Sequence, residues 1–541
     1  MPSSTPRPPH ASPPRPLRRL LLALAAALLV VPLAACGGGG AAAPASEKGV
    51  LTIAMTAADV PSPDTILAGG QGYEGYRFMG NSLYDSLTKW DLQQGDETPG
   101  IIPGLAESWD IDETRTKWTF HLREGVTFHD GTPFDADAVV YNFDRYMNPE
   151  APQYDQTVSG RAGLTAAGVK SYRKVDDSTF EITTNGVWSH LLEDIVFLYI
   201  ASPTAIQTYG KDYADHPAGT GPFAFESLTR GQQAVLVANE DYWGGAPKVD
   251  KLVLKAMPDV SARLAALRAG EVNWVEAPNP DDIAGLESDG YQVLTNSYDH
   301  IWPWILNVRT GPLSDAKVRR ALNLAIDRES MATDLLKDTA DPALQVAPKA
   351  SAAYREDNDT FSYDPAEAKR LLAEAGYPDG FSMSVSYPTS GSGNMQPGPM
   401  NQLLQSDLAK VGVKVELKPI EWAAMLTEFE TGKIPDDADA VNISLTFIQE
   451  AFWGMGFATG GYTNVGGYSN PEVDKLLGEA QVELDHDKRY DIYAQIAAVV
   501  DQDAPWLDVV NDRNPRALSP DVKGFIQPKS WFVDLTTVSV G

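Results

Sequence analysis

Segments typical of strands and of helices alternate along the chain from about residue 50 to its end, and this alternation constrains the fold most. At 118–122, apolar residues alternate with polar ones, as in a half-buried strand. Asp135, a favoured N-cap residue, then precedes apolar side chains at helical spacing over 136–146. Because 43% of the residues are apolar, there is material for a large core and two lobes. The pattern predicts an α/β protein.

Three further helix boundaries are marked by capping residues. Asp364 followed by Pro365 and Glu367 predicts a helix start in which Glu367 reaches back as in a capping box. Asn470 followed by proline predicts a second start. A helix from 261 is expected to stop at Gly270 before a strand over 271–276. Glycine clusters at 390–398 and 460–467 predict surface loops.

The first 36 residues have the order of a bacterial export signal. Arginines precede an apolar run over 20–31, which is too short to span a bilayer comfortably and ends in small residues before Cys36. Cys36 is the single cysteine of the chain, so it has no disulfide partner. The segment resembles the lipobox of bacterial lipoproteins, which implies cleavage after residue 35 and lipidation of Cys36. Residues 36–46 are then expected to form a flexible tether.

The charge of the chain argues against a nucleic-acid partner. The formal net charge is −30, and residues 1–35 hold four arginines and no acids, so their removal would give −30 − 4 = −34. Binding to phosphates needs a basic face. Acidity of this size suits solubility outside the cytoplasm and does not by itself identify a cationic ligand.

Catalytic motifs are absent from the sequence. There is no G-x-S-x-G elbow, H-E-x-x-H helix or P-loop. If 124–125 form a hairpin turn, His121 and His129 point to opposite faces of the sheet and cannot share a metal ion. With 73 acidic residues, no acidic pair stands out for acid/base catalysis. No enzyme activity, cofactor or metal is expected.

Several phrases in the sequence resemble the family 5 solute-binding proteins of ABC importers. The phrases occur in the family's order and cover nearly all of the chain after the tether. They are LYDSL at 83–87, PGLAESW at 103–109, WTFHLREGVTFHDG at 118–131, GTGPF at 219–223, NEDYW at 239–243, VRRAL at 318–322, YDPAEA at 363–368 and GYSNPEVD at 467–474. Members bind dipeptides, oligopeptides, nickel complexes, opines or sugars.

The resemblance implies a two-lobed periplasmic-binding-protein-like fold (type II, cluster C) with an extra subdomain in the first lobe. The first lobe is expected to take 47–90, 212–297 and 505–541, the extra subdomain 91–211, and the second lobe 298–504. The solute would lie between the lobes and favour their closure. The expected partners are a small solute, most simply a short peptide, and the permease subunits of an importer. We expect a monomer held by its lipid at the extracytoplasmic face of the cell membrane.

The candidate ligand-binding residues follow from the places where the resemblance puts the cleft. Tyr73 and Tyr76 precede the first phrase, and Trp302 and Trp304 immediately precede a strand expected at 305–308, after the hinge. Aromatic rings suit a pocket that tolerates varied solutes. Their alternative role is ordinary core packing.

A second group of candidates lies at 445–454, where the sequence departs from the family. Peptide-binding members often have an aspartate there that pairs with the α-amine of the peptide. This chain lacks it, and Glu450 is a possible substitute, with Phe447 and Trp453 as its aromatic neighbours. Peptide, nickel chelate, opine and glycoside therefore remain open as solutes. A secreted hydrolase and a sensor for a signalling protein are the alternatives from other functional classes.

Overall fold

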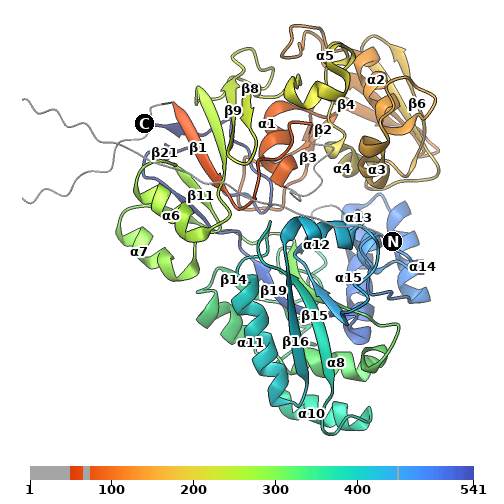
Figure 1. The fold of residues 1–541 in the computed structure, drawn as a ribbon. Helices are drawn as coiled ribbons and strands as arrows, with labels where there is room; N and C mark the ends of the chain where they lie inside the picture. The colour runs from red at the N-terminus through yellow and green to blue at the C-terminus, as the bar shows by residue number, and fades with distance from the viewer. Residues whose placement is uncertain (1–48, 65–73, 448–449) are drawn as a thin grey trace, which may run out of the picture. The chain divides into compact units, whose positions relative to one another are not determined.

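The computed structural model describes residues 49–64, 74–447 and 450–541. In these residues the chain has the predicted α/β architecture, with one large sheet in each of two lobes and a smaller sheet in an extra subdomain (Figure 1). The expected signal, the tether, Cys36 and Tyr73 lie outside the described residues.

The first lobe is built on a mixed sheet that gathers strands from distant parts of the sequence. Strand β1 lies at its centre and pairs in parallel with β10 and β11, while the outer pairs are antiparallel. In sheet order the described strands are β12 (Gln292–Leu294), β20 (Arg516–Leu518), β11 (Trp274–Glu276), β1 (Val50–Met55), β10 (Lys251–Ala256), β9 (Gln233–Ala238) and β8 (Phe223–Thr229). Helices α6 (Val260–Arg268) and α7 (Ile283–Ser288) connect strands of this sheet.

The second lobe has its own mixed sheet, and one of its strands differs from the expected division. Its path is β14 (Ala340–Pro342), β19 (Trp506–Asp512), β13 (His300–Leu306), β17 (Ala440–Asn442), β15 (Ser382–Pro388) and β16 (Lys414–Ile420), with β18 (Leu445–Thr446) beside β13. Strand β19 pairs with β13 and β14, although 505–541 was assigned to the first lobe. The chain therefore rejoins the first sheet only at β20, because the buried strand β19 completes the core of the second lobe.

The extra subdomain is an antiparallel sheet with helices packed on it. Its strand order is β4 (Ala106–Ile111), β5 (Lys117–Leu122), β7 (Thr179–Thr184) and β6 (Val169–Asp176), and it carries α2 (Ala136–Met147) and α3 (Gln156–Thr165). The expected hairpin at 124–125 is wrong, because β5 pairs with β4 and β7 instead. His121 contacts Asp110 at 2.9 Å, and His129 lies 2.9 Å from the carbonyl oxygen of Gly221.

The helix boundaries follow the predicted caps with one exception. Asp135 accepts the amide hydrogen bond of Ala138 at the start of α2. Asn470 similarly caps α14 (Pro471–Val482). Asp364 caps α10 (Pro365–Glu374) through the amides of Ala366 and Glu367. The capping box is wrong, because the Glu367 carboxylate pairs with Arg370 one turn further along the helix.

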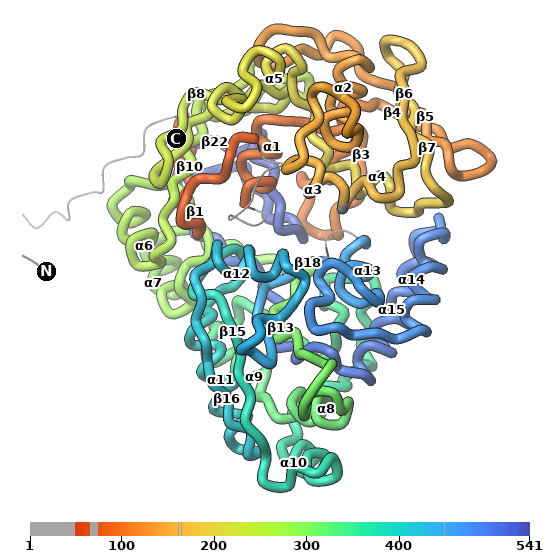
Figure 2. Tube along the Cα trace, turned by 45° about the vertical axis from the view of Figure 1, so that its right-hand side comes forward, coloured from red at the N-terminus to blue at the C-terminus, as the bar shows by residue number. Residues whose placement is uncertain are grey.

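Further helices belong to the second lobe. They are α8 (Ala316–Leu324), α9 (Arg328–Ser330), α11 (Pro397–Lys410), α12 (Trp422–Phe429), α13 (Ala451–Phe457) and α15 (His486–Asp503), whereas α1 (Asn81–Leu83) and α5 (Pro203–Tyr209) come before this lobe in the chain. In Figures 1 and 2, α13, α14 and α15 lie on the side of the second lobe nearest to the extra subdomain, which includes the short helix α4 (Leu191–Asp194). The amide of Ser189 donates to the carbonyl oxygen of Gln481 at 2.9 Å, which joins the two lobes there.

The two glycine clusters are more closely packed than surface loops. Gly391 and Gly393 have positive φ angles, and a Cβ on Gly393 would lie 2.3 Å from Ser444 Oγ. Val465 in the second cluster is fully buried. Both segments need glycine because backbone passes close to neighbouring side chains. Among the described residues, no helix has the length and apolar character that a membrane span requires.

Candidate functional site

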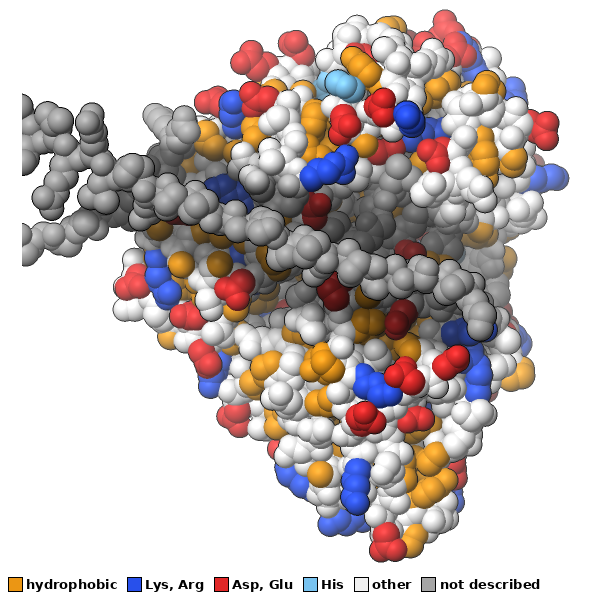
Figure 3. Space-filling view, in the orientation of Figure 1, with side chains coloured by type: hydrophobic (Ala, Val, Ile, Leu, Met, Phe, Trp, Pro, Cys, Tyr) orange, Lys and Arg blue, Asp and Glu red, His pale blue; other side chains and the backbone are white. Residues whose placement is uncertain are grey.

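A cavity of about 570 Å³ lies between the first lobe with its extra subdomain and the second lobe. The face in Figure 3 is hollowed between the lobes, with acidic side chains inside the hollow. The cavity has four aromatic lining residues, Trp90, Trp109, Trp118 and Tyr490, and five charged or titratable ones, Glu193, Asp299, His486, Arg489 and Lys529. A volume of this size with aromatic walls and a few polar groups is typical of small-molecule sites.

Asp299 is the buried acid of this cavity. It directly precedes β13, and its carbonyl oxygen accepts hydrogen bonds from the amide of Phe447 and the hydroxyl of Thr446, both at 2.7 Å. These bonds fix its backbone where β13 meets β18. The residue is 6% exposed, and its Oδ1 has no hydrogen-bond partner among the described residues. Burial raises the pKa of the Asp299 carboxyl to about 7.

Tyr490 forms the wall of the cavity near Asp299. Its ring centroid lies 5.6 Å from that of Tyr493 and 4.6 Å from that of His486 on the same helix, α15. Burial raises the pKa of the Tyr490 hydroxyl well above its usual value, and the charges of Glu450, Glu193 and Asp299 raise it further. The Tyr490 side chain in the cavity wall is therefore neutral and amphipathic, and several acidic residues lie near it.

Glu450, the predicted partner for an ammonium group, is already paired with a cation. It is 2% exposed, and Arg489 Nη2 donates to its Oε1 at 2.8 Å while Arg489 Nε donates to Oε2. The hydroxyl of Tyr493 adds a third hydrogen bond at 3.3 Å. Two parallel bonds from one guanidinium satisfy a carboxylate well. The charge of Glu450 is therefore neutralised inside the second lobe.

Glu193, a residue of the extra subdomain, lies close to the ion pair of Glu450 and Arg489. Burial raises the pKa of the Glu193 carboxyl well above its usual value, the negative charge of Glu450 raises it further, and the positive charge of Arg489 lowers it. Glu193 lies in α4, next to the Ser189 contact with α14 described above. The extra subdomain and the second lobe thus interact electrostatically at the edge of the cavity.

The predicted aromatic residues lie in hydrophobic clusters. Trp302 and Trp304 are fully buried in the core of the second lobe, where Trp304 Nε1 donates to Asn401 Oδ1 at 2.7 Å. Phe447 and Trp453 pack on each other with ring centroids 4.8 Å apart, in the cluster beside Asp299. Tyr76 lies in the first-lobe core, 5.2 Å from the ring of Phe197. Ligand contact by these residues, by Glu450 and by Tyr73 stays a prediction.

A second cavity between the lobes, of about 390 Å³, lies near α6 and the start of α11. Arg263, on the first-lobe wall of this cavity, donates to the carbonyl oxygens of Met257, Pro258, Glu276 and Ala277. These hydrogen bonds hold the neighbouring backbone segments in place. Across the cavity, Gln396 Nε2 donates to Asn279 Oδ1 at 2.9 Å. This bond is a direct polar contact between the two lobes.

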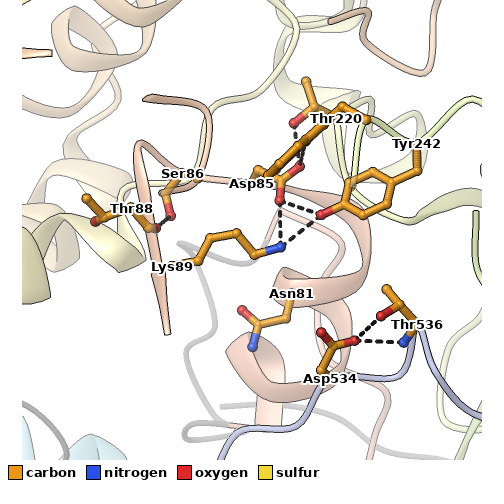
Figure 4. A network of polar contacts seen from close by, with 12 residues as sticks. Asn81, Asp85, Ser86, Thr88, Lys89, Thr220, Tyr242, Asp534 and Thr536 are labelled. Atoms are coloured by element: carbon orange, nitrogen blue, oxygen red, sulfur yellow. Dashed lines mark hydrogen bonds and ion pairs between the residues drawn. The ribbon is translucent and has the colours of Figure 1, made fainter. Parts of the chain in front are cut away.

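The phrases that carried the family resemblance meet in a polar network around Asp85 (Figure 4). Its carboxylate accepts hydrogen bonds from Thr220 Oγ1 at 3.0 Å, the Tyr242 hydroxyl at 3.0 Å and Trp243 Nε1 at 2.8 Å. Lys89 Nζ lies 3.4 Å from the same carboxylate. The phrases at 83–87, 219–223 and 239–243 thus hold the first lobe together.

Comparisons with known proteins agree with this arrangement. Residues 100–449 match the family model of bacterial extracellular solute-binding proteins, family 5. Heme-binding protein A of Haemophilus influenzae is 32% identical, covering 88% of this chain and 90% of that protein. The dipeptide-binding protein of Escherichia coli is 28% identical, covering 88% and 95%. The structure of the ABC transporter-associated periplasmic binding protein DppA from Helicobacter pylori with peptide STSA aligns with a TM-score of 0.79 at 25% identity, covering 91% of this chain and 98% of that one.

Two α/β lobes with a solute-sized cavity between them define a two-lobed binding protein. The chain belongs to the bacterial extracellular solute-binding proteins, family 5. The predicted family and the predicted two-lobed type II fold with an extra subdomain are therefore confirmed.

Proposed function

We propose that this chain captures a small solute outside the cytoplasm and presents it to the permease of an ABC-type importer, with a short peptide as the preferred solute. The observation that carries the proposal is the cavity of about 570 Å³, whose walls come from both lobes. A solute that contacts both walls stabilises the closed arrangement, since only differential affinity shifts such an equilibrium. The closed surface is then what the permease recognises.

The preference for a peptide is supported by the relatives and by the cavity. A dipeptide-binding protein and two di/tripeptide-binding proteins are among the similar proteins. A buried carboxylate beside aromatic walls suits a solute with an amine and an apolar side chain. Heme is the second candidate, because the most identical relative quoted above is a heme-binding protein. Nickel chelate, opine and glycoside are weaker candidates without a specific contact in their favour.

Solute binding without turnover is the second part of the proposal. The family consists of solute-binding proteins. In the described residues, no three His, Cys, Asp or Glu side chains gather as a metal site would require. A secreted hydrolase would convert peptides or esters into products, whereas a binding protein returns them unchanged.

Attachment to the membrane is proposed to occur through a lipid on Cys36 after cleavage at residue 35. The support is the order of arginines, apolar run and small residues before this cysteine. In cells, Cys36→Ser is expected to move the protein from the membrane fraction to the soluble extracytoplasmic fraction. A protein that stayed with membranes after this change would contradict the proposal.

The proposed function is tested by native mass spectrometry of the protein isolated from its host, followed by titration with dipeptides, tripeptides and heme. We expect a retained mass that corresponds to a short peptide, and small-angle scattering that reports compaction when that peptide is added back. Retention of heme would replace the peptide with the second candidate. Conversion of peptides into amino acids would overturn the binding role.

A further inference from the structure

Asp299 has the structural properties of a ligand-binding acid, and none of the family phrases contains it. The residue lines the cavity between the lobes, it is 6% exposed, and its Oδ1 has no hydrogen-bond partner in the described part of the chain. Its backbone, by contrast, is held by two hydrogen bonds of 2.7 Å. The backbone of Asp299 is therefore held in place, while Oδ1 of its carboxyl group is left without a hydrogen bond from the described residues.

An uncompensated carboxylate in such a place costs stability unless something neutralises it. The cations nearest to the cavity are Arg489 and Lys529. Arg489 donates from Nε and Nη2 to Glu450 and from Nη1 to the carbonyl oxygen of Glu483. Burial is the cause that raises the pKa of Asp299, with no nearby positive charge lowering it. Among the residues that the structure describes, no positive charge thus compensates that of Asp299.

We propose that Asp299 accepts the ammonium group of the solute, so that this protein selects amine-bearing solutes with an apolar or aromatic part. The inference rests on the proposed function and names the chemistry of its solute. Trp90 and Tyr490 line the same cavity and offer aromatic faces to the apolar part and to the cation itself. Asp299 thereby takes the role that the sequence suggested for Glu450.

The proposed role of Asp299 excludes two classes of solute. A solute without a positive charge leaves the Asp299 carboxylate buried and unpaired, and a solute with two carboxylates adds repulsion to that cost. Lys529 and His486 at the cavity edge can face a carboxylate of a zwitterionic solute. A free dipeptide can pair its ammonium group with Asp299 and its carboxylate with Lys529 or His486. An N-acetylated dipeptide has no ammonium group and can make only the second of these contacts.

The test compares four probes on the full chain by isothermal titration calorimetry at pH 8. The probes are the dipeptide Ala-Phe, its N-acetyl derivative, 2-phenylethylamine and 2-phenylethanol. The wild type is expected to bind each amine at least about tenfold more tightly than its uncharged counterpart, as one charged hydrogen bond in a dry site allows. Asp299→Asn is expected to lose this discrimination.

Two variants keep the test decisive. Asp501→Asn is the matched control, because Asp501 is also buried with a pKa raised to about 7 but accepts hydrogen bonds from the Val346 amide and Asn358 inside the second lobe. It should keep the preference for amines. Asp299→Glu keeps the carboxylate on a side chain that is longer by one methylene group, and it should retain part of the preference for amines. This variant serves as the test if Asp299→Asn folds poorly.

Each outcome is decisive. Amine binding that depends on Asp299 supports the inference, and it does so for 2-phenylethylamine even if Ala-Phe fails to bind, in which case the peptide function is overturned instead. Equal binding of Ala-Phe and N-acetyl-Ala-Phe by wild type and Asp299→Asn overturns the inference and leaves the peptide function standing. If none of the amines binds to the wild type, the inference is wrong.

Discussion

Asp85 and Asp299 are both buried acids, 3% and 6% exposed, but their surroundings are opposite. Asp85 accepts three hydrogen bonds from side chains of the first lobe and lies 3.4 Å from a lysine. The Oδ1 atom of Asp299 has no hydrogen-bond partner among the described residues. Asp85 belongs to a recognisable family phrase, whereas Asp299 belongs to none.

The difference separates two uses of a buried charge. A carboxylate with all its bonds made orders the residues around it and contributes to one unique packing. A carboxylate without partners lowers stability and is retained where a ligand supplies what is missing. We expect the first kind to recur across a family that binds different solutes, and the second kind to vary with the solute.

The largest effect is expected from Asp85→Ala. The change leaves the Tyr242 hydroxyl and Trp243 Nε1 buried without an acceptor and removes the counter-charge of Lys89, so the free energy of unfolding should fall by about 4 kcal/mol. Urea denaturation followed by tryptophan fluorescence measures it. Asp110→Ala, at an exposed acid that contacts His121, is the control and should be almost neutral. A small loss for Asp85→Ala would remove the contrast between the two acids.

The next effect concerns Glu450, which resembles Asp85 rather than Asp299. Glu450→Gln leaves the buried Arg489 without its charge partner, although Glu193 nearby offsets part of the loss, and should lower the free energy of unfolding by about 3 kcal/mol. Glu479→Gln, in an exposed pair with Lys475, is the control. If Glu450→Gln instead abolished peptide binding in a stable protein, Glu450 would be the ammonium partner after all.

The sequence allowed much of the fold to be predicted, because its signals are local. Asp135, Asp364 and Asn470 mark helix starts that the structure confirms. The predicted hairpin at 124–125 is wrong, and the pairing of β19 with the second sheet was not foreseen, since strand pairing depends on contacts between residues far apart in sequence. Local patterns do not encode which strand is a neighbour.

The candidate site was harder to predict than the fold. Trp302 and Trp304 lie in a hydrophobic cluster of the second lobe. Aromatic side chains in a sequence do not by themselves distinguish core packing from the lining of a pocket, so contact of these two residues with a solute stays a prediction. The pairing of Glu450 with Arg489 joins residues that are 39 positions apart, so no local pattern indicates it. Asp299 had one usable signal, its place at the expected start of the second lobe, which was assigned to 298–504.

Asp299→Asn is expected to stabilise the protein. Burial raises the pKa of Asp299 from 3.8 to about 7, so between those values the folded protein keeps a proton that the unfolded chain has released. The wild type therefore loses stability as the pH rises through this window. The variant should exceed it by about 2 kcal/mol at pH 8 and match it near pH 4. Asp501→Asn should gain less, because that acid accepts two hydrogen bonds. Destabilisation by Asp299→Asn at pH 8 would mean that Asp299 is satisfied like Asp85.

The smallest expected effect is on solute affinity, and it distinguishes a hydrogen bond between the lobes from one within a single lobe. Gln396→Ala removes the 2.9 Å hydrogen bond to Asn279, and Gln405→Ala removes a 2.8 Å bond to the carbonyl oxygen of Val415 inside the second lobe. A bond made only when the lobes are closed biases closure, so Gln396→Ala should weaken solute affinity about two- to threefold, which corresponds to about 0.5 kcal/mol. Gln405→Ala should leave the affinity unchanged and lower only the free energy of unfolding. Calorimetric titration of both variants with the same solute measures this difference. Equal affinities would show that the Gln396 bond persists in the open protein, and solute selection would then depend on Asp299 and the aromatic walls alone.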